Sequence, residues 1–434
     1  MENTISDMNW LYEGFKAAMS CSPWKEEPQR FEIDFLSQLT YLSNELDDRT
    51  YKTMPGSEFP IRERGKERYI HGNRTRDKIV RHCLCDNTLA DALQPYQIYN
   101  NGASQKGKGI SFSRRIFERD LHNYYLKHGS NKGFVCFVDF SKYYDNIRHD
   151  KAKELILPKL DEFSAWLFEN IVDTFKIDVS YMSDEEYEHC LDECFNSITY
   201  HEQHTPEELT GKKFMAKSFD IGDQVSQSVG VFFPTRIDNY VKIVRWCKFC
   251  GRYMDDLYFI VKTRDEAKSI IAGIKEEARN LGIFINDSKT QIVPLSHTFT
   301  YLKIRYSLDD NGKVIKRISP ETVTRQRQKL KAYKRLLDRK EMAYIQIENA
   351  YKSWMGSFAP IMSKKQIKHM KSLYFELFGK DVRWKKIPSH SHSQTGKKSP
   401  VQSTGTTTSP GMKSQSQTSQ TSTLSEQPST GLPW

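Results

Sequence analysis

Two adjacent carboxylates, Asp255 and Asp256, are the residues of this sequence best placed to do chemistry. Apolar, strand-forming residues flank them on both sides, and this pattern predicts a β-hairpin with both acids at its tip. Two like charges side by side repel each other unless a cation neutralises them. Oxygen ligands on a rigid turn suit Mg²⁺, which also bridges to the phosphates of a substrate. An ordinary surface turn with two aspartates is the alternative interpretation.

A third acid strengthens the metal interpretation. The apolar run 134–138 predicts a buried strand that ends at Asp139. An acid at the end of such a strand can face the acidic hairpin across a sheet. Three carboxylates from two strands would hold two metal ions about 4 Å apart, the arrangement used for nucleotidyl transfer. Because more than a hundred residues separate Asp139 from Asp255, the fold has to assemble this site.

The composition indicates a polyanionic partner. The 434 residues carry a net charge of +10, and 12% of them are aromatic. This mixture suits a groove that holds a phosphate backbone and stacks bases, although solubility alone can account for a moderate positive charge. The sequence shows neither a membrane-spanning apolar stretch nor a signal-peptide pattern. We therefore expect a cytoplasmic protein with no membrane partner and with its eight cysteines reduced.

The first third of the chain is expected to combine helices with a basic, glycine-rich loop. Residues 1–60 show helical periodicity, and the chain is strongly basic from 61 to 125. The loop 100–109 leads into an amphipathic helix and contains Lys106 and Lys108, which we expect to contact phosphate. It does not match the phosphate-binding P-loop pattern, and a flexible surface turn is the alternative.

The rest of the chain predicts mostly helices, with an acidic insert at about 177–210. Helices are expected over 151–175, 227–244 with a bend at Pro234, and 265–282. From Ser319 the chain predicts a very basic helix, in which Arg325 and Lys329 are candidates for gripping a duplex. A solvated helix face is the alternative. The Ser-, Thr- and Gln-rich segment 385–434 predicts a disordered tail.

Several motifs, taken in order, resemble those of bacterial reverse transcriptases over roughly 61–380. The segments that carry the resemblance are Asp139–Ile147 for the first catalytic motif, Gly222–Gln227 for the following turn, Tyr253–Asp256 for the YxDD box, Leu281–Thr290 for the next motif, and Phe299–Leu302 for the primer-grip hairpin. Each motif is weak alone. Their common order and workable spacing make the resemblance specific.

The resemblance implies an α+β fold of the right-hand polymerase type. Fingers and palm would span 61–315, including the acidic insert, and the palm would be an antiparallel sheet backed by helices. The thumb would be the basic helical region 316–384. Residues 1–60 would form a helical N-terminal extension, and 385–434 the disordered tail.

The resemblance also implies roles for individual residues. Asp139, Asp255 and Asp256 would be catalytic and, with Phe140, would bind two Mg²⁺ ions, for which Mn²⁺ could substitute. The implied substrate-binding residues are Tyr144, Gly222, Ser226, Gln227, Lys289 and Arg68.

Three of these residues have more specific implied roles. The aromatic ring of Tyr144 would lie under the sugar and exclude a 2′-hydroxyl, which favours dNTPs over NTPs. Lys289 would stabilise or protonate the leaving pyrophosphate, and Arg68 would hold the triphosphate. A core aromatic residue and a solvent-exposed lysine are the alternative interpretations of Tyr144 and Lys289.

Some positions depart from the pattern of many reverse transcriptases. Ile221 and Gln227 stand where many members have Gln and Pro, and Lys303 replaces the primer-grip glycine. The versions at 221–227 are similar to those of diversity-generating retroelements and of other unusual bacterial lineages, retron-like and phage-defence enzymes among them. Because no maturase or endonuclease region is evident, a complete group II intron protein is disfavoured.

The function predicted from the resemblance is RNA-directed synthesis of cDNA from a cognate RNA, in bacterial antiphage defence. The expected partners are a template RNA, with a dedicated non-coding RNA as one option, the DNA product and dNTPs; an oligomer is compatible with the sequence. One alternative is the mutagenic enzyme of a diversity-generating retroelement, and the other is a catalytically inactive nucleic-acid-binding scaffold. The template, the primer and the product are left open.

Overall fold

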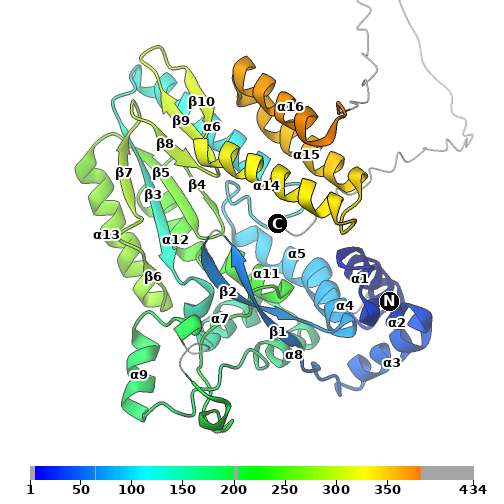
Figure 1. Cartoon of the computed structure of the whole chain (residues 1–434). Helices are drawn as coiled ribbons and strands as arrows, with labels where there is room; N and C mark the ends of the chain where they lie inside the picture. The colour runs from blue at the N-terminus through cyan, green and yellow to red at the C-terminus, as the bar shows by residue number, and fades with distance from the viewer. Residues whose placement is uncertain (1–4, 64, 200–203, 383–434) are drawn as a thin grey trace, which may run out of the picture. The chain divides into compact units, whose positions relative to one another are not determined.

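The computed structural model describes residues 5–63, 65–199 and 204–382. These residues form a mixed fold of helices and antiparallel sheets (Figure 1). The mixture of helices and antiparallel strands implied by the resemblance is therefore confirmed. The tail expected over 385–434 lies outside the described residues.

The central sheet has five antiparallel strands: β3 (Phe134–Ser141), β4 (Cys250–Tyr253), β5 (Asp256–Val261), β6 (Phe284–Ile285) and β7 (Gln291–Pro294). Their order is β4-β5-β3-β6, and β7 also pairs with β3. The short strand β7 was not predicted from the sequence. The predicted buried strand ending near Asp139 is confirmed.

Side chains alternate between the two faces along each strand of the central sheet. Both faces are covered by apolar cores. Val135, Tyr258 and Ile260 belong to one apolar core together with residues of α6 (Ile110–His128). Cys136 and Phe259 belong to the other core, with residues of α13 (Arg264–Leu281). Helix α13 was predicted to within two residues.

A second, three-stranded sheet consists of β8 (Phe299–Tyr301), β9 (Ile304–Leu308) and β10 (Val314–Ile318). Leu302 and Lys303 form the first turn with φ of 44° and 71°, so both adopt the left-handed conformation of a two-residue hairpin. The second turn is closed by Asp309, whose carboxylate accepts hydrogen bonds from the amides of Asn311 and Lys313. The run Asp309–Lys313 has the composition of a hairpin turn.

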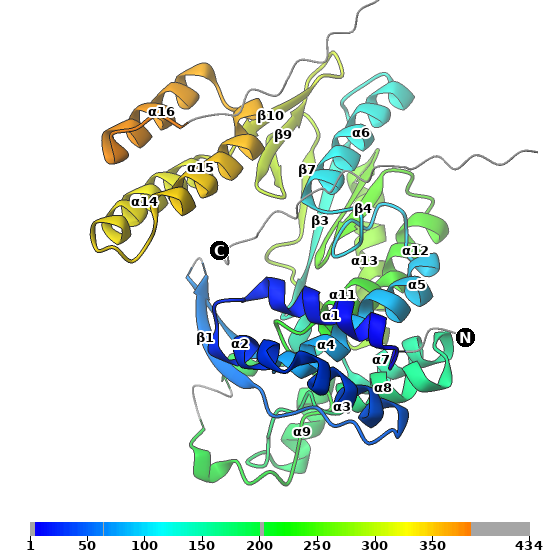
Figure 2. The same cartoon turned by 90° about the vertical axis from the view of Figure 1, so that its right-hand side faces the viewer.

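The N-terminal helices are α1 (Met8–Cys21), α2 (Glu26–Ile33) and α3 (Phe35–Asp47). They are followed by an antiparallel hairpin, β1 (Ser57–Glu63) and β2 (Lys66–Gly72), and by α4 (Thr75–Leu84). The sequence did not predict this hairpin, whose strands are polar and include Pro60. Figures 1 and 2 both show β1 and β2 as a ribbon separate from the central sheet.

Short helices follow α4 or lie between β3 and β4. They are η1 (Cys85–Leu89), α5 (Ala90–Leu93), η3 (Tyr144–Asn146), α7 (His149–Ile156), α8 (Glu162–Val172), α9 (Asp184–Asp192), α11 (Gln224–Phe232), α12 (Thr235–Asn239) and η6 (Tyr240–Val244). The helix expected over 227–244 is divided at Pro234, in agreement with the predicted bend.

The last described elements are α14 (Pro320–Asp338), α15 (Tyr344–Phe358) and α16 (Lys364–Phe378), drawn in yellow and orange in Figure 1. Ser319 caps α14 by accepting a hydrogen bond from the Thr322 amide, which confirms the predicted helix start. Buried side chains on all three helices, Leu330, Tyr351 and Tyr374 among them, pack the group together. The guanidinium of Arg114 on α6 lies over the Phe358 ring and donates to the Leu302 carbonyl, which connects α15 and the second sheet to α6.

Candidate active site

The hairpin of β4 and β5 places Asp255 and Asp256 at its tip, as predicted. Tyr253 and Asp256 are the last paired residues, and Met254 and Asp255 form the turn between them. Met254 has a φ of 57°, so the turn uses a left-handed residue that is not glycine. Such a conformation costs energy and requires support from the surroundings.

The third acid lies directly across the sheet. Asp139 on β3 is the register partner of Asp256 on β5. Desolvation and the neighbouring carboxylates of Asp255 and Asp139 raise the pKa of Asp256 to about 7, although the side chain retains access to solvent. Desolvation, and then the Asp139 charge, also raise the pKa of Asp255. The three carboxylates therefore interact electrostatically, as the sequence predicted.

Asp139 already has a cationic partner. The ammonium of Lys289 lies 2.6 Å from its carboxylate, with 48% of the lysine side chain exposed. The turn that carries Lys289 is anchored to β3, because the amide of Asn286 donates to the Asp139 carbonyl at 2.8 Å. Asn286 in turn accepts from the Lys289 amide. This ion pair was not predicted from the sequence.

The donor set fits a hard divalent cation, since carboxylate oxygens that repel one another are stabilised by positive charge. Within residues 5–63, 65–199 and 204–382, however, no three His, Cys, Asp or Glu side chains form a group arranged to hold an ion. The predicted metal site and the observed arrangement of the acids therefore differ. We attribute this difference to the ion pair between Asp139 and Lys289. Phe140 has no side-chain oxygen, so only its main-chain carbonyl could bind an ion; its ring is buried and stacks on Tyr143.

Tyr144 lies beside the acidic turn. Its hydroxyl is 3.6 Å from the sulfur of Met254, and the nearby charge of Asp255 contributes, after burial, to a raised pKa of the phenol. A Cβ added at Gly230 of α11 would lie 3.0 Å from the Tyr144 ring, so the absence of a side chain there leaves space for the ring. From this position the Tyr144 ring could contact the sugar of a nucleotide. The ring also packs against Gly230.

The turn at Gly222 contacts the β1–β2 hairpin. Gly222 has a φ of 109°, and a Cβ there would lie 3.0 Å from the carbonyl oxygen of His71. The amide of His71 donates to the Ile221 carbonyl at 3.0 Å. The hairpin also carries Arg68, whose positive charge lowers the pKa of Asp255 and opposes the larger effect of desolvation. Glycine is required here for both conformation and space.

Asp223 fixes the start of α11 and joins it to α4. Its carboxylate accepts hydrogen bonds from the amides of Val225 and Ser226, which caps the helix. The same carboxylate forms a buried ion pair with Arg81 and accepts from Asn73 at 2.7 Å. Of the two other predicted residues on α11, the Ser226 hydroxyl is buried without a hydrogen-bond partner among the described residues, and Gln227 is exposed.

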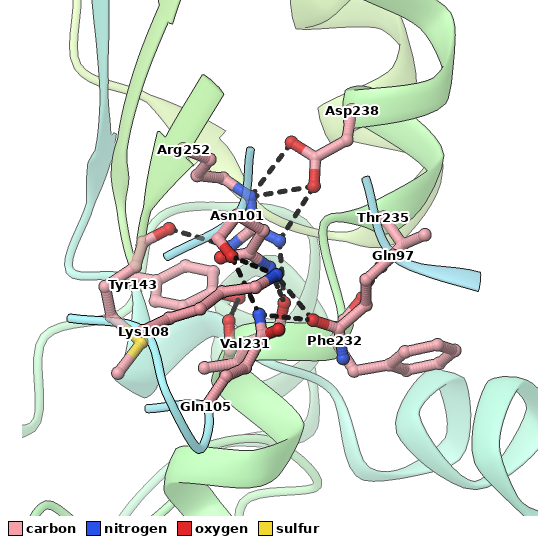
Figure 3. A network of polar contacts seen from close by, with 12 residues as sticks. Gln97, Asn101, Gln105, Lys108, Tyr143, Val231, Phe232, Thr235, Asp238 and Arg252 are labelled. Carbon is pink, nitrogen blue, oxygen red and sulfur yellow. Dashed lines mark hydrogen bonds and ion pairs between the residues drawn. The ribbon is translucent and has the colours of Figure 1, made fainter. Parts of the chain in front are cut away.

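Arg252, which was not predicted as a site residue, connects the turn that carries Asp255 to Asp238 and Val231 (Figure 3). It is fully buried, and its guanidinium donates to both carboxylate oxygens of Asp238 at 2.8–3.0 Å. It also donates to the carbonyls of Val231 at 2.6 Å and Met254 at 2.9 Å. An arginine within an otherwise apolar strand, next to the acidic motif, was the signal that could have revealed it.

The glycine-rich loop docks on the strand that carries Arg252. The amide of Gly102 donates to the Arg252 carbonyl, and the Arg252 amide donates to the Asn100 carbonyl. Lys108 donates to the carbonyls of Tyr99 and Asn101 at 2.9 and 3.1 Å, and desolvation lowers its pKa. In this structure Lys108 thus holds the loop together (Figure 3), whereas Lys106 is exposed.

The two predicted basic residues of α14 are on a different element from the acids. Arg325 is exposed, and the Lys329 ammonium lies 5.4 Å from the centre of the Tyr333 ring. The two residues are separated by one helical turn and share a face of α14.

The family model for reverse transcriptase (RNA-dependent DNA polymerase) matches residues 64–306, which is more than half of the chain. The chain therefore belongs to the reverse transcriptase family and is an RNA-directed DNA polymerase, a nucleotidyltransferase that uses an RNA template and dNTPs. A search of curated proteins finds no match. Among the described residues, no helix has the length and apolarity needed to cross a bilayer.

Proposed function

We propose that this reverse transcriptase makes cDNA from a cognate RNA by nucleotidyl transfer at Asp139, Asp255 and Asp256. The observation that carries the proposal is the register pairing of Asp139 with Asp256, together with the raised pKa values of Asp255 and Asp256, to which the charge of Asp139 contributes. These three side chains and the main chain of Phe140 would hold two Mg²⁺ ions, or Mn²⁺ in their place. Such ions lower the pKa of a primer 3′-hydroxyl and neutralise charge on the triphosphate.

Several neighbouring residues would serve the same reaction. Lys289, which neutralises Asp139, is proposed to stabilise or protonate the leaving pyrophosphate. Arg68 would hold the triphosphate, since its charge already acts on Asp255. Tyr144 would exclude a 2′-hydroxyl from the sugar position, next to Met254. Gly222, Ser226 and Gln227 would line the substrate side of α11.

The domain layout that fits this function is a right hand. Fingers and palm would occupy 61–315, including the acidic insert at about 177–210, with the central antiparallel sheet as the palm. The thumb would be 316–384, which contains α14 to α16, and 1–60 would be a helical extension. Lys106, Lys108, Arg325 and Lys329 would contact nucleic acid. The engagement of Lys108 within its loop favours an indirect role for that residue.

Bacterial antiphage defence in the cytoplasm is the biological setting that we propose. The residues Ile221 and Gln227 support it, because they distinguish the turn from that of many reverse transcriptases. They equally favour the second candidate, the mutagenic enzyme of a diversity-generating retroelement. A neighbouring template repeat and variable gene would decide between the two. The presence of all three acids argues against an inactive binding scaffold.

The replacement Asp255→Asn tests the proposed chemistry. It should abolish dNTP incorporation on a homopolymeric RNA template with a DNA primer, because one of the metal-binding carboxylates is lost. A second measurement is independent of activity: Mg²⁺ or Mn²⁺ should raise the Tm of the wild-type protein, and this increase should shrink in the variant.

Asp91→Asn is the matched control, since Asp91 is an exposed residue of α5 and lies on none of the strands that carry the three acids. This variant should keep both the activity and the increase in Tm. Full incorporation by Asp255→Asn would overturn the proposed site and favour the scaffold alternative.

A further inference from the structure

The acidic insert at about 177–210 is joined to the turn that carries Tyr144 by the segment that follows the insert. The amide of Phe219 donates to the Tyr144 carbonyl at 3.0 Å, and the amide of Ser218 donates to the Ile147 carbonyl at 3.1 Å. Neither hydrogen bond involves the three proposed catalytic acids. The chain that leaves the insert therefore contacts the backbone of Tyr144 itself.

The acidic insert has a small apolar core of its own. Val179, Phe195 and Met215 are buried together in this core. Backbone hydrogen bonds close the insert at its base, because the Val179 amide donates to the Lys213 carbonyl at 2.8 Å and the Met215 amide donates to the Ile177 carbonyl at 2.9 Å. A packed insert with a closed base can hold a neighbouring turn in one position.

Asn146 joins the turn to the insert. It is fully buried and ends the short helix η3, which begins at Tyr144. Its side-chain amide donates to the Lys142 carbonyl at 2.9 Å and to the Phe195 carbonyl at 3.0 Å. Its side-chain oxygen accepts from the Phe195 amide at 2.8 Å and from the Lys217 ammonium at 3.2 Å. One buried side chain thus bridges both ends of the turn and the insert.

Lys217 connects Asn146 to the end of α9. It is fully buried, and its ammonium also donates to the carbonyls of Leu191 at 3.4 Å and Glu193 at 2.8 Å. These acceptors are neutral oxygens, and the C-terminal end of a helix favours a cation. Loss of the ammonium would leave buried oxygens without their donor, which is costly. Lys217 therefore fixes the end of α9 against the turn that carries Tyr144.

The residues on both sides of Tyr144 are also held. The Tyr143 hydroxyl donates to the Gly230 carbonyl of α11 at 2.8 Å. The Asp145 carboxylate accepts from the amide of Ser197 at 3.2 Å and from its hydroxyl at 2.9 Å. Helix α11 thus restrains one neighbour of Tyr144, and the insert restrains the other. The direction of the Tyr144 ring follows from the backbone that these contacts fix.

We propose that Asn146 and Lys217 are positioning residues, through which the acidic insert sets the Tyr144 ring against the sugar of the incoming nucleotide. This inference rests on the proposed function, in which Tyr144 excludes a 2′-hydroxyl. Neither positioning residue touches the substrate. Because a displacement of about 1 Å is enough to weaken a contact that depends on geometry, a loosened turn would discriminate less well between dNTPs and rNTPs.

The first test is Lys217→Met, which removes the ammonium but keeps most of the side-chain length. The ratio of kcat/KM for dNTPs to that for rNTPs should fall by about threefold or more, because the ring is held less firmly. Lys213→Met is the matched control, since the Lys213 ammonium donates to the Met182 carbonyl at 3.1 Å and to Asp184 at 2.7 Å, at the start of α9. This control should keep the wild-type ratio.

The second test combines Lys217→Met with Tyr144→Ala. If Lys217 acts through Tyr144, the added Lys217→Met should change the dNTP-to-rNTP ratio of the Tyr144→Ala protein no further. A merely structural effect would lower the incorporation of both nucleotide types alike and leave the ratio unchanged. An unchanged ratio in Lys217→Met would therefore overturn the proposal. So would a loss in the double variant equal to the sum of the two single losses.

The Tm of each variant shows whether it is folded. If Lys217→Met does not fold, Ser197→Ala decides by the same ratio, because it removes only the hydroxyl contact with Asp145 from a partly exposed residue. A wild-type chain that incorporates no dNTP would refute the proposed function and this inference together. Incorporation of dNTPs with a ratio that responds to neither Lys217→Met nor Ser197→Ala would refute this inference alone.

Discussion

At the scale of single residues, Tyr144 lies close both to Met254, in the turn that carries Asp255, and to Gly230 of α11. If the ring excludes a 2′-hydroxyl, Tyr144→Ala should raise the incorporation of rNTPs relative to dNTPs by at least about tenfold, which corresponds to about 1.4 kcal/mol of discrimination. Tyr144→Phe keeps the ring and should keep the selectivity. The ratio of kcat/KM values for the two nucleotide types is the measurement. Equal ratios in all three proteins would identify Tyr144 as a packing residue.

Residues were predictable where their chemistry is local to the sequence. Asp255 and Asp256 could be identified because two adjacent acids between apolar strands have few structural uses. Arg252 and the ion pair of Lys289 with Asp139 could not, because their partners are distant in the chain and only the fold brings them together. Lys108 shows the same limit: a lysine in a glycine-rich loop suggests a phosphate, yet backbone carbonyls of its own loop surround the ammonium.

At the scale of elements, Arg252 joins β4 to α11 and α12. Arg252→Lys keeps the charge but loses the planar fork that contacts Asp238, Val231 and Met254 together. We expect unfolding to become easier by about 3 kcal/mol and kcat to fall more than the KM for dNTP rises, since the turn is displaced. Thermal unfolding and steady-state kinetics measure the two effects.

Arg236→Lys is the control for Arg252→Lys. Arg236 also forms an ion pair from α12, with Glu277, but 58% of its side chain is exposed. A change there should cost less than about 1 kcal/mol and leave kcat unaltered. Equal effects of the two substitutions would argue against a specific role for the buried guanidinium.

The contact between the β1–β2 hairpin and the Gly222 turn is a second link between elements. Gly222→Ala should lower the Tm and raise the KM for dNTP, because the new methyl group meets the His71 backbone at a φ of 109°. Gly211→Ala is the control, with a φ of 70° but open space around the glycine. It should lower the Tm slightly and leave the KM unchanged. A KM that stays constant in Gly222→Ala would separate the hairpin from substrate binding.

Elements were predictable in proportion to the clarity of their periodicity. The helix α13 and the hairpin of β4 and β5 have strong apolar patterns, and both were predicted closely. The β1–β2 hairpin was missed because its strands are mostly polar and contain Pro60, a residue that argues against a strand. It is held by contacts with the Gly222 turn, which the local sequence does not reveal.

At the scale of the whole molecule, Asp120 makes the stability depend on pH. Desolvation raises its pKa to about 6, against the opposing effect of the hydrogen bond from Tyr258 at 2.9 Å. The folded state thus binds this proton more tightly than the unfolded state, with a pKa of about 3.9. The corresponding stability is present below about pH 4 and is lost as the pH rises through 6.

Asp120→Asn should remove this dependence, because the amide does not ionise. Relative to the wild-type protein, the variant should gain about 2–3 kcal/mol of stability between pH 4 and pH 7, measured as the difference in Tm at each pH. Asp91→Asn, at an exposed position, should show a difference that does not change with pH. A constant difference for Asp120→Asn as well would mean that the buried carboxyl is already ionised at pH 4.

The position of β3 in the sheet has a consequence for how the proposed catalytic carboxylates move. β3 pairs with β5 on one edge and with β6 and β7 on the other, so Asp139 cannot shift unless several ladders of hydrogen bonds open together. Asp255 belongs to a two-residue turn with far fewer restraints, apart from the bond between Arg252 and the Met254 carbonyl. Asp139 is therefore held in a fixed position, whereas Asp255 can adjust its position. We expect Asp255 to be the carboxylate that adapts to different bound groups.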